Sequence, residues 1–563
     1  MRVRVWAPHA TRLDYLTGKH RTPLTREGEW WTGDVLDGAE YLLSVDGGPG
    51  YPDPRSRYQP HGVHGPSQAI DLAFDWTDSG WQPGTCLGKV WYEVHVGTFT
   101  REGTLDSAIE RLPHLRDVGI EVVELMPLAA FPGARGWGYD GVSLYAVHEA
   151  YGGPAALQRF VDAAHGHGIA VALDAVYNHL GPAGNYLSQF GPYFTSTHST
   201  PWGDAVNLDA PEAQGMRQFI RDNARHWFEH FHIDALRLDA VHELWDDSSR
   251  HILAELSDEK SRWEAELGRT LTLVAESDLN DVSMITATAA GGLGMDGQWA
   301  DDVHHALHSY LNGETFGYYV DFGAPEALVT AFSNVFVHSG GYSTFRGKDW
   351  GAPVPPELDR ARFVTCTQNH DQVGNRGLGD RPDARLPRGT VMAGSALLLL
   401  GPFTPLLFQG QEWGTLTPFQ FFTDHEGELG AAISAGRLEE FARHGWDELY
   451  GDGFEVPDPQ AESTFRASVL DWDEPHRHGD VLAAHRDLIA LRPLIARDRL
   501  TQPSFGEGWF RLDRTRLSVI THPHEGSSSH EIGTGDVLWS WGQVERDGGD
   551  LTLGPHSVAV ISR

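Results

Sequence analysis

Apolar and polar residues alternate in short runs over the first 86 residues of the chain. Runs such as Arg2–Trp6 and Glu40–Val45 are separated by turns of glycine, proline and aspartate. A period of two over five or six positions is typical of strands that bury one face. We therefore expect residues 1–86 to form a β-sandwich of the immunoglobulin-like kind, with a loop over residues 51–67 that leads to the next domain.

From Lys89 onward, short apolar runs alternate with stretches that have the spacing of amphipathic helices. Strands that alternate with helices imply right-handed parallel crossovers, and about 400 residues of them predict a (β/α)8 barrel over residues 87–491. The eight predicted strands are 90–96, 121–125, 169–176, 232–238, 270–275, 294–299, 363–367 and 405–408. The helices predicted between the first four are 105–118, 154–167 and 211–231.

Two further regions complete the predicted organisation. Residues 177–210 are rich in Gly, Pro, Tyr and Asn, and a long irregular connection inside a compact domain is usually functional. From residue 492 the pattern returns to short alternating runs, which predict a C-terminal β-sandwich over residues 492–563. The predicted class is α/β, a TIM barrel flanked by N-terminal and C-terminal β-sandwich domains.

Net charge, the longest apolar run and the cysteine content limit the possible partners and the expected location of the protein. The net charge is −35, and this sign argues against nucleic acid, whose phosphates require a basic surface. The longest apolar run, near residues 396–403, is too short to span a membrane, so we expect no membrane partner. Two cysteines, Cys86 and Cys366, and an N-terminus without an apolar leader suit a reducing cytoplasm.

Polar clusters follow the ends of several predicted strands, where catalytic groups of a parallel barrel collect. Three carboxylates, Asp239, Glu276 and Asp371, would then face one pocket. Glycoside hydrolysis requires at least two carboxyl groups beside the glycosidic bond.

The surroundings of two carboxylates favour different protonation states. Arg237 and Asp239 share one side of a strand, and a nearby guanidinium favours the ionised form of Asp239 that a nucleophile needs. Glu276 follows mostly apolar residues, so partial desolvation would keep its proton for general acid catalysis. The alternatives are a barrel-closing salt bridge for the first pair, and a helix cap or surface residue for Glu276.

Further side chains could bind sugar hydroxyls. Asp371 and His370 follow one strand, Asp174 and His179 another, and Tyr139 in a glycine-rich loop could stack on the reacting ring. A lone histidine is more often structural, and Tyr139 could be a plain loop aromatic. A zinc site is possible with 30 histidines, but no metal-binding spacing supports it, so we expect no metal and no cofactor.

Taken in order along the chain, these clusters resemble glycoside hydrolase family 13, the α-amylase family. The resemblance implies an α-glucan substrate and a retaining mechanism without a cofactor. It implies that Asp239 is the nucleophile, with Arg237 as its partner, and that Glu276 is the acid/base. Asp371 would stabilise the transition state beside His370. The remaining positions implied to surround the sugar are Asp174, His179 and Tyr139.

Within that family, the ranges 57–67, 92–100 and 421–430 resemble members that cleave the α-1,4 bond next to a terminal trehalose unit. A synthase of the same pathway would supply that substrate. Glu243 stands where amylases often carry a histidine, and we hypothesise that it recognises trehalose. Asn178 matches a calcium-ligating position of many amylases, but no other ligand can be assigned, so no essential metal is predicted.

Two other functions stay open on the sequence. A glycogen branching enzyme would transfer the glucosyl intermediate to another glucan chain instead of to water. A non-catalytic glucan-binding protein on the same barrel would typically lack one of the carboxylates. Since Asp239, Glu276 and Asp371 are all present, the non-catalytic alternative is disfavoured.

Overall fold

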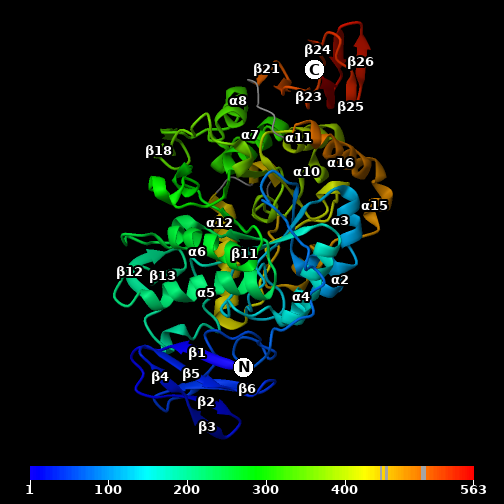
Figure 1. Cartoon of the computed structure of the whole chain (residues 1–563). Coiled ribbons are helices and arrows are strands. Elements are labelled where there is room, and N and C mark those ends of the chain that lie inside the picture. The colour runs from blue at the N-terminus through cyan, green and yellow to red at the C-terminus, as the bar shows by residue number, and fades with distance from the viewer. Residues whose placement is uncertain (444–446, 451–453, 496–502) are drawn as a thin grey trace.

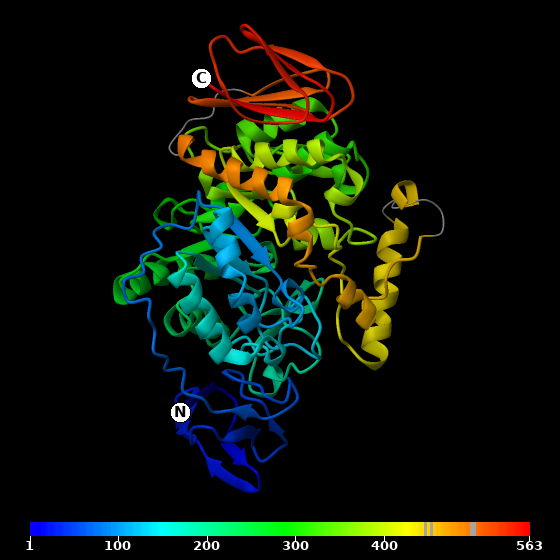
Figure 2. The same ribbon diagram turned by 90° about the vertical axis from the view of Figure 1, so that its right-hand side faces the viewer.

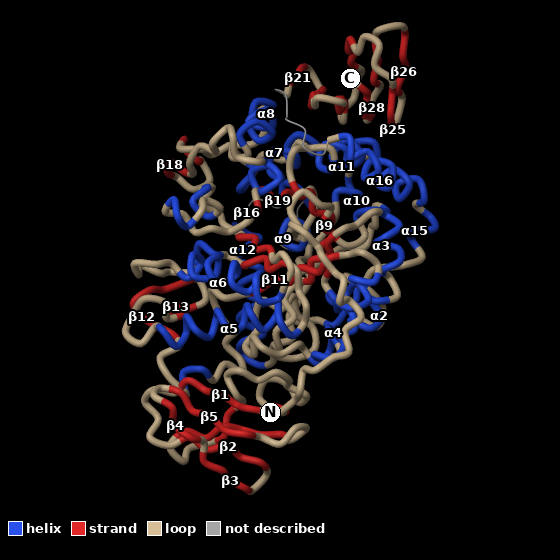
Figure 3. Tube along the Cα trace, in the orientation of Figure 1, coloured by secondary structure: helices blue, strands red, loops and turns tan. Residues whose placement is uncertain are grey.

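The computed structural model of the chain describes residues 1–443, 447–450, 454–495 and 503–563. Eight parallel strands close into a barrel at the centre of the molecule (Figures 1 and 3). In barrel order they are β9 (Trp91–Val94), β10 (Val122–Leu125), β11 (Ala170–Ala175), β14 (Ala235–Leu238), β15 (Thr272–Ala275), β16 (Gly297–Trp299), β19 (Phe363–Cys366) and β20 (Thr404–Phe408). Each coincides with a predicted strand to within a few residues, so the predicted barrel is confirmed.

An apolar cluster fills the inside of the barrel. It contains at least one buried side chain from every barrel strand. It combines large residues such as Trp91 and Trp299 with small ones such as Ala172 and Ala235. Side chains alternate along a strand, so the inward positions nearer the carboxyl ends follow at steps of two and include Glu93 and Arg237. The polar site therefore lies above a dry interior.

Two of the predicted helices differ from the structure, one because it is divided in two and the other because it begins later. The range 105–118 forms two helices, α2 (Leu105–Ile109) and α3 (Leu112–Val118), because Pro113 has no N–H to continue α2 and instead occupies the first turn of α3. The helix predicted from residue 211 is α5 (Gln214–His230). A turn precedes it, in which Glu212 has a φ of +63°. The predicted helix 154–167 is confirmed as α4 (Gly153–Gly166).

The inserted region 177–210 is more regular than predicted. It contains an antiparallel hairpin of β12 (Phe194–Thr200) and β13 (Gly203–Val206), with an irregularity in the register between Thr195 and Ser199. The threonine-rich strand has the β-branched side chains that suit a pleated surface. The hairpin projects from the side of the barrel next to α5 and α6 (Ile252–Leu267) (Figure 1).

Antiparallel sheets lie at both ends of the chain, on opposite sides of the barrel (Figures 1 and 2). The N-terminal sheets are β1-β5-β4 and β3-β2-β6-β7, with β8 paired to β6. Their strands are β1 (Arg2–Trp6), β2 (Leu13–Thr17), β3 (His20–Pro23), β4 (Thr25–Glu27), β5 (Trp30–Asp34), β6 (Glu40–Val45), β7 (Gly50–Tyr51) and β8 (Ser67–Gln68). The predicted strands 2–6 and 40–45 are confirmed, and 51–67 is a loop apart from its two ends.

The C-terminal sheets are β21-β22-β23-β28-β25 and β24-β27-β26. Their strands are β21 (Ser504–Gly506), β22 (Trp509–Asp513), β23 (Leu517–His522), β24 (Ser528–Glu531), β25 (Val537–Trp541), β26 (Val544–Asp547), β27 (Asp550–Leu553) and β28 (Ser557–Ser562). The larger sheet packs through β28 and β23 on α11 (Arg388–Leu399), a buried barrel helix that contains part of the longest apolar run. Among the described helices, none is both long and apolar enough to cross a membrane.

The N-terminal sheets are joined to the barrel by a close contact between Trp6 and α5. The Trp6 side chain is buried, and a Cβ atom at position 215 of α5 would overlap the indole ring. Glycine is therefore the residue that allows the helix to approach β1.

We predict that Gly215→Ala lowers the free energy of unfolding by about 1–3 kcal/mol, because the added methyl group overpacks the Trp6 contact. The measurement is urea unfolding of both proteins with their m-values. The matched control is Gly436→Ala in α12 (Gly427–Arg443), where a Cβ would meet nothing within 4 Å. That change should leave stability unchanged or raise it by up to about 1 kcal/mol. Equal losses in both variants would contradict the proposed contact.

Candidate active site

One buried guanidinium, that of Arg237, brings three of the predicted site carboxylates together. Its Nη1 donates hydrogen bonds to Asp174 (2.8 Å to Oδ2) and to Asp239 (2.7 Å to Oδ1). Its Nη2 lies 3.1 Å from Oε2 of Glu276. The arrangement follows from the barrel, because β11, β14 and β15 are neighbours and the three acids stand at or just beyond their carboxyl ends.

The surroundings of Asp239 favour its charged form. Burial by itself raises the pKa of Asp239, but the charge of Arg237 and a hydrogen bond from the Asn178 amide (2.8 Å to Oδ2) together outweigh it. The net pKa of Asp239 is therefore lowered. The same amide also donates to the backbone carbonyl of Asp239 (2.7 Å), so Asn178 fixes both the position and the charge of this carboxylate.

Glu276 has the opposite balance. Burial raises its pKa to about 8 against the effect of Arg237, and the negative charges of Asp239 and Asp371 add to the increase. A single backbone N–H, that of Ala240, donates to Oε2 (2.6 Å). Ala240 has a φ of +38°, an uncommon conformation for alanine. Glu276 consequently holds a proton at neutral pH beside an ionised Asp239.

Asp371 and His370 open α9 (His370–Gly374), directly beyond β19. His370 is buried, and its Nδ1 lies 2.6 Å from Oε1 of Glu93 while its Nε2 lies 3.4 Å from Oδ2 of Asp371. Burial lowers the pKa of His370, but the charges of Asp371 and Glu93 raise it to about 10, so the ring is an imidazolium. The Asp371 side chain is 37% exposed, compared with 11% for Asp239 and 18% for Glu276, and is the most accessible of the three.

Tyr139 and His179 border the same group of residues. The Tyr139 hydroxyl donates to Oδ2 of Asp174 (2.6 Å) and lies 2.7 Å from Nε2 of His370. Nε2 of His179 lies 2.8 Å from the Tyr139 carbonyl. The His179 ring stacks on Trp202, with centroids 4.0 Å apart and planes 5° apart. Trp202 lies in the turn of the inserted hairpin, so the region 177–210 reaches the site.

A cavity of about 380 Å³ opens beside these residues. It shares Tyr139 and His179 with the polar cluster, and aromatic and aliphatic side chains form much of its remaining wall. Such a wall suits the apolar faces of sugar rings. The other lining residues are Trp137, Gly138, Asp140, Leu180, Gly181, Pro182, Trp202, Phe421, Thr423, His425, Leu429 and Ile433.

Glu243 lies on the loop that follows Asp239, in a single turn of 3₁₀ helix (Val241–Glu243). It is partly buried and accepts a 3.3 Å hydrogen bond from Nε1 of Trp245. Trp245 is 44% exposed and stacks at 5.8 Å on His198 of β12. Glu243 therefore lies at an accessible edge, four residues beyond Asp239.

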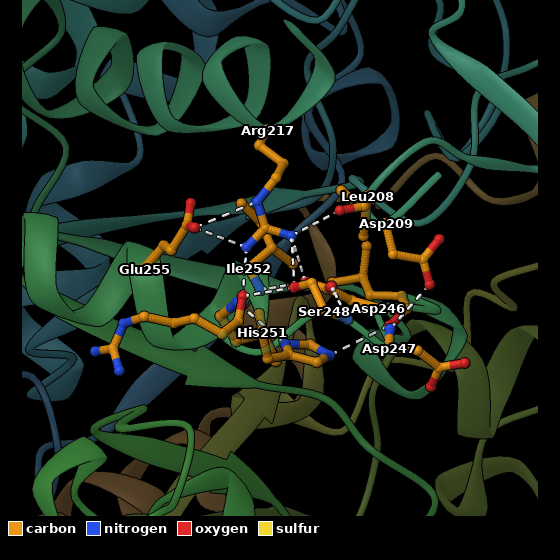
Figure 4. Close-up of polar contacts among 12 residues, drawn as sticks. Leu208, Asp209, Arg217, Asp246, Asp247, Ser248, His251, Ile252 and Glu255 are labelled. Atoms are coloured by element: carbon orange, nitrogen blue, oxygen red, sulfur yellow. Dashed lines mark hydrogen bonds and ion pairs between the residues drawn. The ribbon is translucent and has the colours of Figure 1, made fainter. Parts of the chain in front are cut away.

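Arg217 of α5 holds the rest of this loop in place (Figure 4). Its Nη1 donates to the Leu208 carbonyl (2.8 Å) and to Oδ2 of Asp246 (2.6 Å), and its Nη2 lies 2.8 Å from Oε1 of Glu255. Asp246 in turn accepts a hydrogen bond from the backbone of Ile252 (2.6 Å). The end of the insertion, the loop after β14 and α6 thus share one buried cation.

Three residues near the site were not predicted. Glu93 holds His370, the Trp299 ring lies 4.4 Å from the guanidinium carbon of Arg237, and burial with the charge of Asp371 raises the pKa of Asp301 to about 7. Glu93 has a sequence signal, since it is a carboxylate inside an apolar strand. Asp301 also has one, because it follows the strand that ends at Trp299.

The part of the chain that the structure describes contains one group of three side chains that could hold a metal ion, namely His198, Asp209 and Asp247. Nε2 of His198 lies 2.8 Å from Oδ2 of Asp209, which is the geometry of a hydrogen-bonded pair. The side chain of Asn178, which matches a calcium-ligating position of amylases, contacts Asp239 and His179.

Comparison with known proteins agrees with the geometry. The family description "Alpha amylase, catalytic domain" matches residues 73–199. A solved structure titled as a putative alpha amylase from Salmonella typhimurium is 35% identical, with a TM-score of 0.89 over 100% of this chain and 97% of that one. A pullulanase from Anoxybacillus, 18% identical with a TM-score of 0.69 over 100% of this chain and 86% of its own, shows the same fold.

Comparison with curated relatives identifies a narrower family. Malto-oligosyltrehalose trehalohydrolase from Arthrobacter ramosus is 48% identical over 100% of this chain and 99% of its own length. The protein of the same name from Rhizobium sp. (strain M-11) is 45% identical over 100% and 97%. A 1,4-alpha-glucan branching enzyme from Corynebacterium jeikeium is 28% identical over 73% of this chain and 60% of its own. The chain therefore belongs to the malto-oligosyltrehalose trehalohydrolase family, whose barrel is of the alpha-amylase type.

Proposed function

We propose that this chain hydrolyses the α-1,4-glucosidic bond next to the terminal trehalose unit of a maltooligosyl trehalose, releasing trehalose and a shortened maltooligosaccharide. The substrate is inferred from the names of relatives that are 45–48% identical over the full chain. The chemistry rests on one observation, the convergence of Asp239 and Glu276 on Arg237 with pKa shifts in opposite directions.

In the proposed first step, the ionised Asp239 attacks the anomeric carbon while Glu276 donates its proton to the glycosidic oxygen, and the trehalose side leaves. In the second step, Glu276 accepts a proton from water, which displaces Asp239 from the covalent β-glucosyl intermediate. Two inversions give net retention, and this route requires carboxyl groups about 5–5.5 Å apart. Contact of both carboxylates with one guanidinium supports such a separation.

The remaining predicted residues would bind the sugar on the glycone side of the cleaved bond. Asp371, the most exposed carboxylate, would accept hydrogen bonds from hydroxyl groups and stabilise the oxocarbenium-like transition state. The imidazolium of His370 directs one N–H at Glu93 and the other at Tyr139 and Asp371, so it would hold these two sugar-binding side chains in place. Tyr139 and His179 line the cavity and would contact the ring, while Asp174 holds Tyr139 and Arg237.

The nature of the acceptor distinguishes this proposal from its main alternative. A branching enzyme would use the same residues but pass the glucosyl group to another glucan, and a relative with that name is 28% identical. Two incubations separate the two functions. Release of free trehalose from a trehalose-ended glucan supports hydrolysis, whereas new α-1,6 linkages formed in amylose would support transfer.

We also infer a place for the reaction in a pathway. A glucan with a terminal trehalose unit must first be made from an ordinary maltooligosaccharide, so a maltooligosyltrehalose synthase is the expected functional partner. The cytoplasmic location expected from the cysteine content stays a prediction.

We predict that Asp239→Ala and Glu276→Gln each reduce turnover at least 100-fold, because each removes a group that takes part in bond cleavage. Trehalose release is the measurement. Glu276→Gln should still bind substrate, because the amide keeps the shape of the side chain. The control is Glu110→Gln, an exposed carboxylate outside the site. A loss of less than tenfold in either site variant would refute the assigned roles.

We predict a bell-shaped pH dependence of kcat/KM. Activity should fall on the acid side as Asp239 is protonated, below the usual pKa of about 4 for aspartate, because its pKa is lowered. On the alkaline side it should fall near pH 8, where Glu276 loses its proton. With α-maltosyl fluoride, whose leaving group needs no protonation, the alkaline limb for the first fluoride release should disappear. An alkaline limb near pH 8 that persists with the fluoride would exclude Glu276 as its source.

We predict that Glu243→Gln lowers the preference for a trehalose-ended glucan over a plain maltooligosaccharide of equal length. A glutamate accepts hydrogen bonds from sugar hydroxyls at both oxygens, and the amide can do so at only one. The measurement is kcat/KM on both substrates, so a general loss of activity cancels in the ratio. An unchanged ratio would remove Glu243 from trehalose recognition.

A further inference from the structure

A second cleft, of about 280 Å³, lies where the N-terminal sheets meet α5 of the barrel. β1 and α5 face each other across this junction (Figure 1). The lining side chains come from four separate parts of the chain: the N-terminal residue with the first strand, the loop after β7, Tyr145, and the second half of α5. They are Met1, Arg2, Val3, Arg4, Asp53, Arg55, Arg57, Tyr145, Asp222, Arg225, His226, Glu229 and His230.

The charge of this cleft is opposite to that of the whole molecule. The chain has 78 acidic and 43 basic residues, yet the cleft is lined by five arginines and three acids. A cluster of like charges repels itself unless counter-ions or ligands balance it. The question is therefore which of these arginines have a partner within the protein.

The two outer arginines are balanced. Arg225 pairs with Glu229 (2.7 Å) and with Glu266 (2.9 Å), and Arg2 pairs with Glu27 (3.1 Å). These pairs are exposed and would be screened by salt. The surplus positive charge therefore resides on the three remaining arginines.

Arg4 and Arg55 share a single carboxylate. Nη1 of Arg55 donates to Oδ2 of Asp222 (2.7 Å), and Nη1 of Arg4 lies 3.6 Å from the same oxygen. The other oxygen of Asp222 accepts from the Gln218 amide (2.6 Å). Burial lowers the pKa of Arg4, and the nearby charge of Arg55 lowers it further, which reflects the repulsion between the two guanidiniums.

The third inner arginine, Arg57, makes no hydrogen bond and no ion pair with any residue that the structure describes. The nearby Asp53 is already bound at both oxygens, by the Tyr41 hydroxyl (2.7 Å) and the Arg55 backbone N–H (2.8 Å). Burial and the charge of Arg57 lower the pKa of His230, so this ring is neutral and leaves the positive charge in place. Among the described residues, one carboxylate thus serves two arginines, and the third has no ion-pair partner.

Two of the three inner arginines, Arg4 and Arg55, are held before any ligand arrives. The guanidinium carbon of Arg4 lies 3.8 Å from the ring centre of Trp30, and that of Arg55 lies 5.0 Å from the same ring. Cation–π contacts fix the planes of both groups. An ordered guanidinium presents its N–H groups as a fork that matches the oxygens of a phosphate.

We propose that this cleft binds a phosphate monoester or inorganic phosphate, held by Arg4 and Arg57 beside the charge of Arg55. The volume lies just below the usual range of about 300–1,000 Å³ for ligand pockets, which suits a free phosphate or a small sugar phosphate. This binding is separate from the glycosidic chemistry, so it stands or falls independently of the proposed hydrolase activity.

The test is isothermal titration of the full chain at low ionic strength, with inorganic phosphate in one series and glucose 6-phosphate in another. We expect saturable binding at one site per chain. Binding of both ligands indicates recognition of the phosphate group alone, and tighter binding of glucose 6-phosphate indicates a sugar phosphate. The absence of saturable binding of either ligand up to about 10 mM would overturn the proposal.

Variants connect any binding to this cleft. Arg57→Gln should weaken binding at least tenfold without changing the melting temperature, because Arg57 has no ion-pair partner to lose in the part of the chain that the structure describes. The matched control is Arg486→Gln, an exposed arginine on α16 (Gly479–Leu491), which should bind as the wild type does. Equal affinities for Arg57→Gln and the wild type would place the ligand elsewhere and refute the assignment.

Discussion

The site depends on one buried cation. Arg237 is fully enclosed, and three carboxylates from neighbouring strands contact it. A charge buried in this way is stable only while its partners stay in place. The partners feel it unequally, because Asp239 receives a direct hydrogen bond from Arg237 and another from Asn178, whereas Glu276 receives its hydrogen bond from a backbone N–H. Asp239 therefore has a lowered pKa and Glu276 a raised pKa, although both carboxylates contact the same guanidinium.

A second chain of contacts links the opposite side of the barrel to the same cation. Glu93 holds His370, the His370 ring meets the Tyr139 hydroxyl, and that hydroxyl donates to Asp174 beside Arg237. Glu93, His370 and Asp174 are buried and Tyr139 is partly buried, so each constrains the rotamer of the next. The proposed sugar-binding residues are therefore part of one network and not independent side chains on flexible loops.

α5 connects features that are far apart in the molecule. Near its N-terminal end it packs on the N-terminal sheets through Gly215 and carries Arg217, which fixes the loop with Asp246. Its second half lines the arginine-rich cleft through Asp222. The strand that carries Arg237 follows this helix in the chain. A single helix therefore supports the edge of the active site and the N-terminal cleft.

Much of the fold and the site could be predicted from the sequence, because the signals are local. Strand periodicity and strand ends place Asp239, Glu276 and Asp371 on one rim, and the family resemblance agrees with the curated relatives. Their catalytic roles stay predictions. Two local features differ from the prediction, because Pro113 divides a predicted helix and two strands pair within residues 177–210.

Other features were decided only by the tertiary structure. Glu93 and His370 are 277 positions apart, and closure of the barrel brings them into contact. Trp202 reaches His179 because the turn of the inserted hairpin lies against the site. The arginines of the N-terminal cleft come from segments that are separate in the sequence. The sequence alone determined which side chains carry charge and where strands end, whereas their pKa values and partners depend on distances that packing sets.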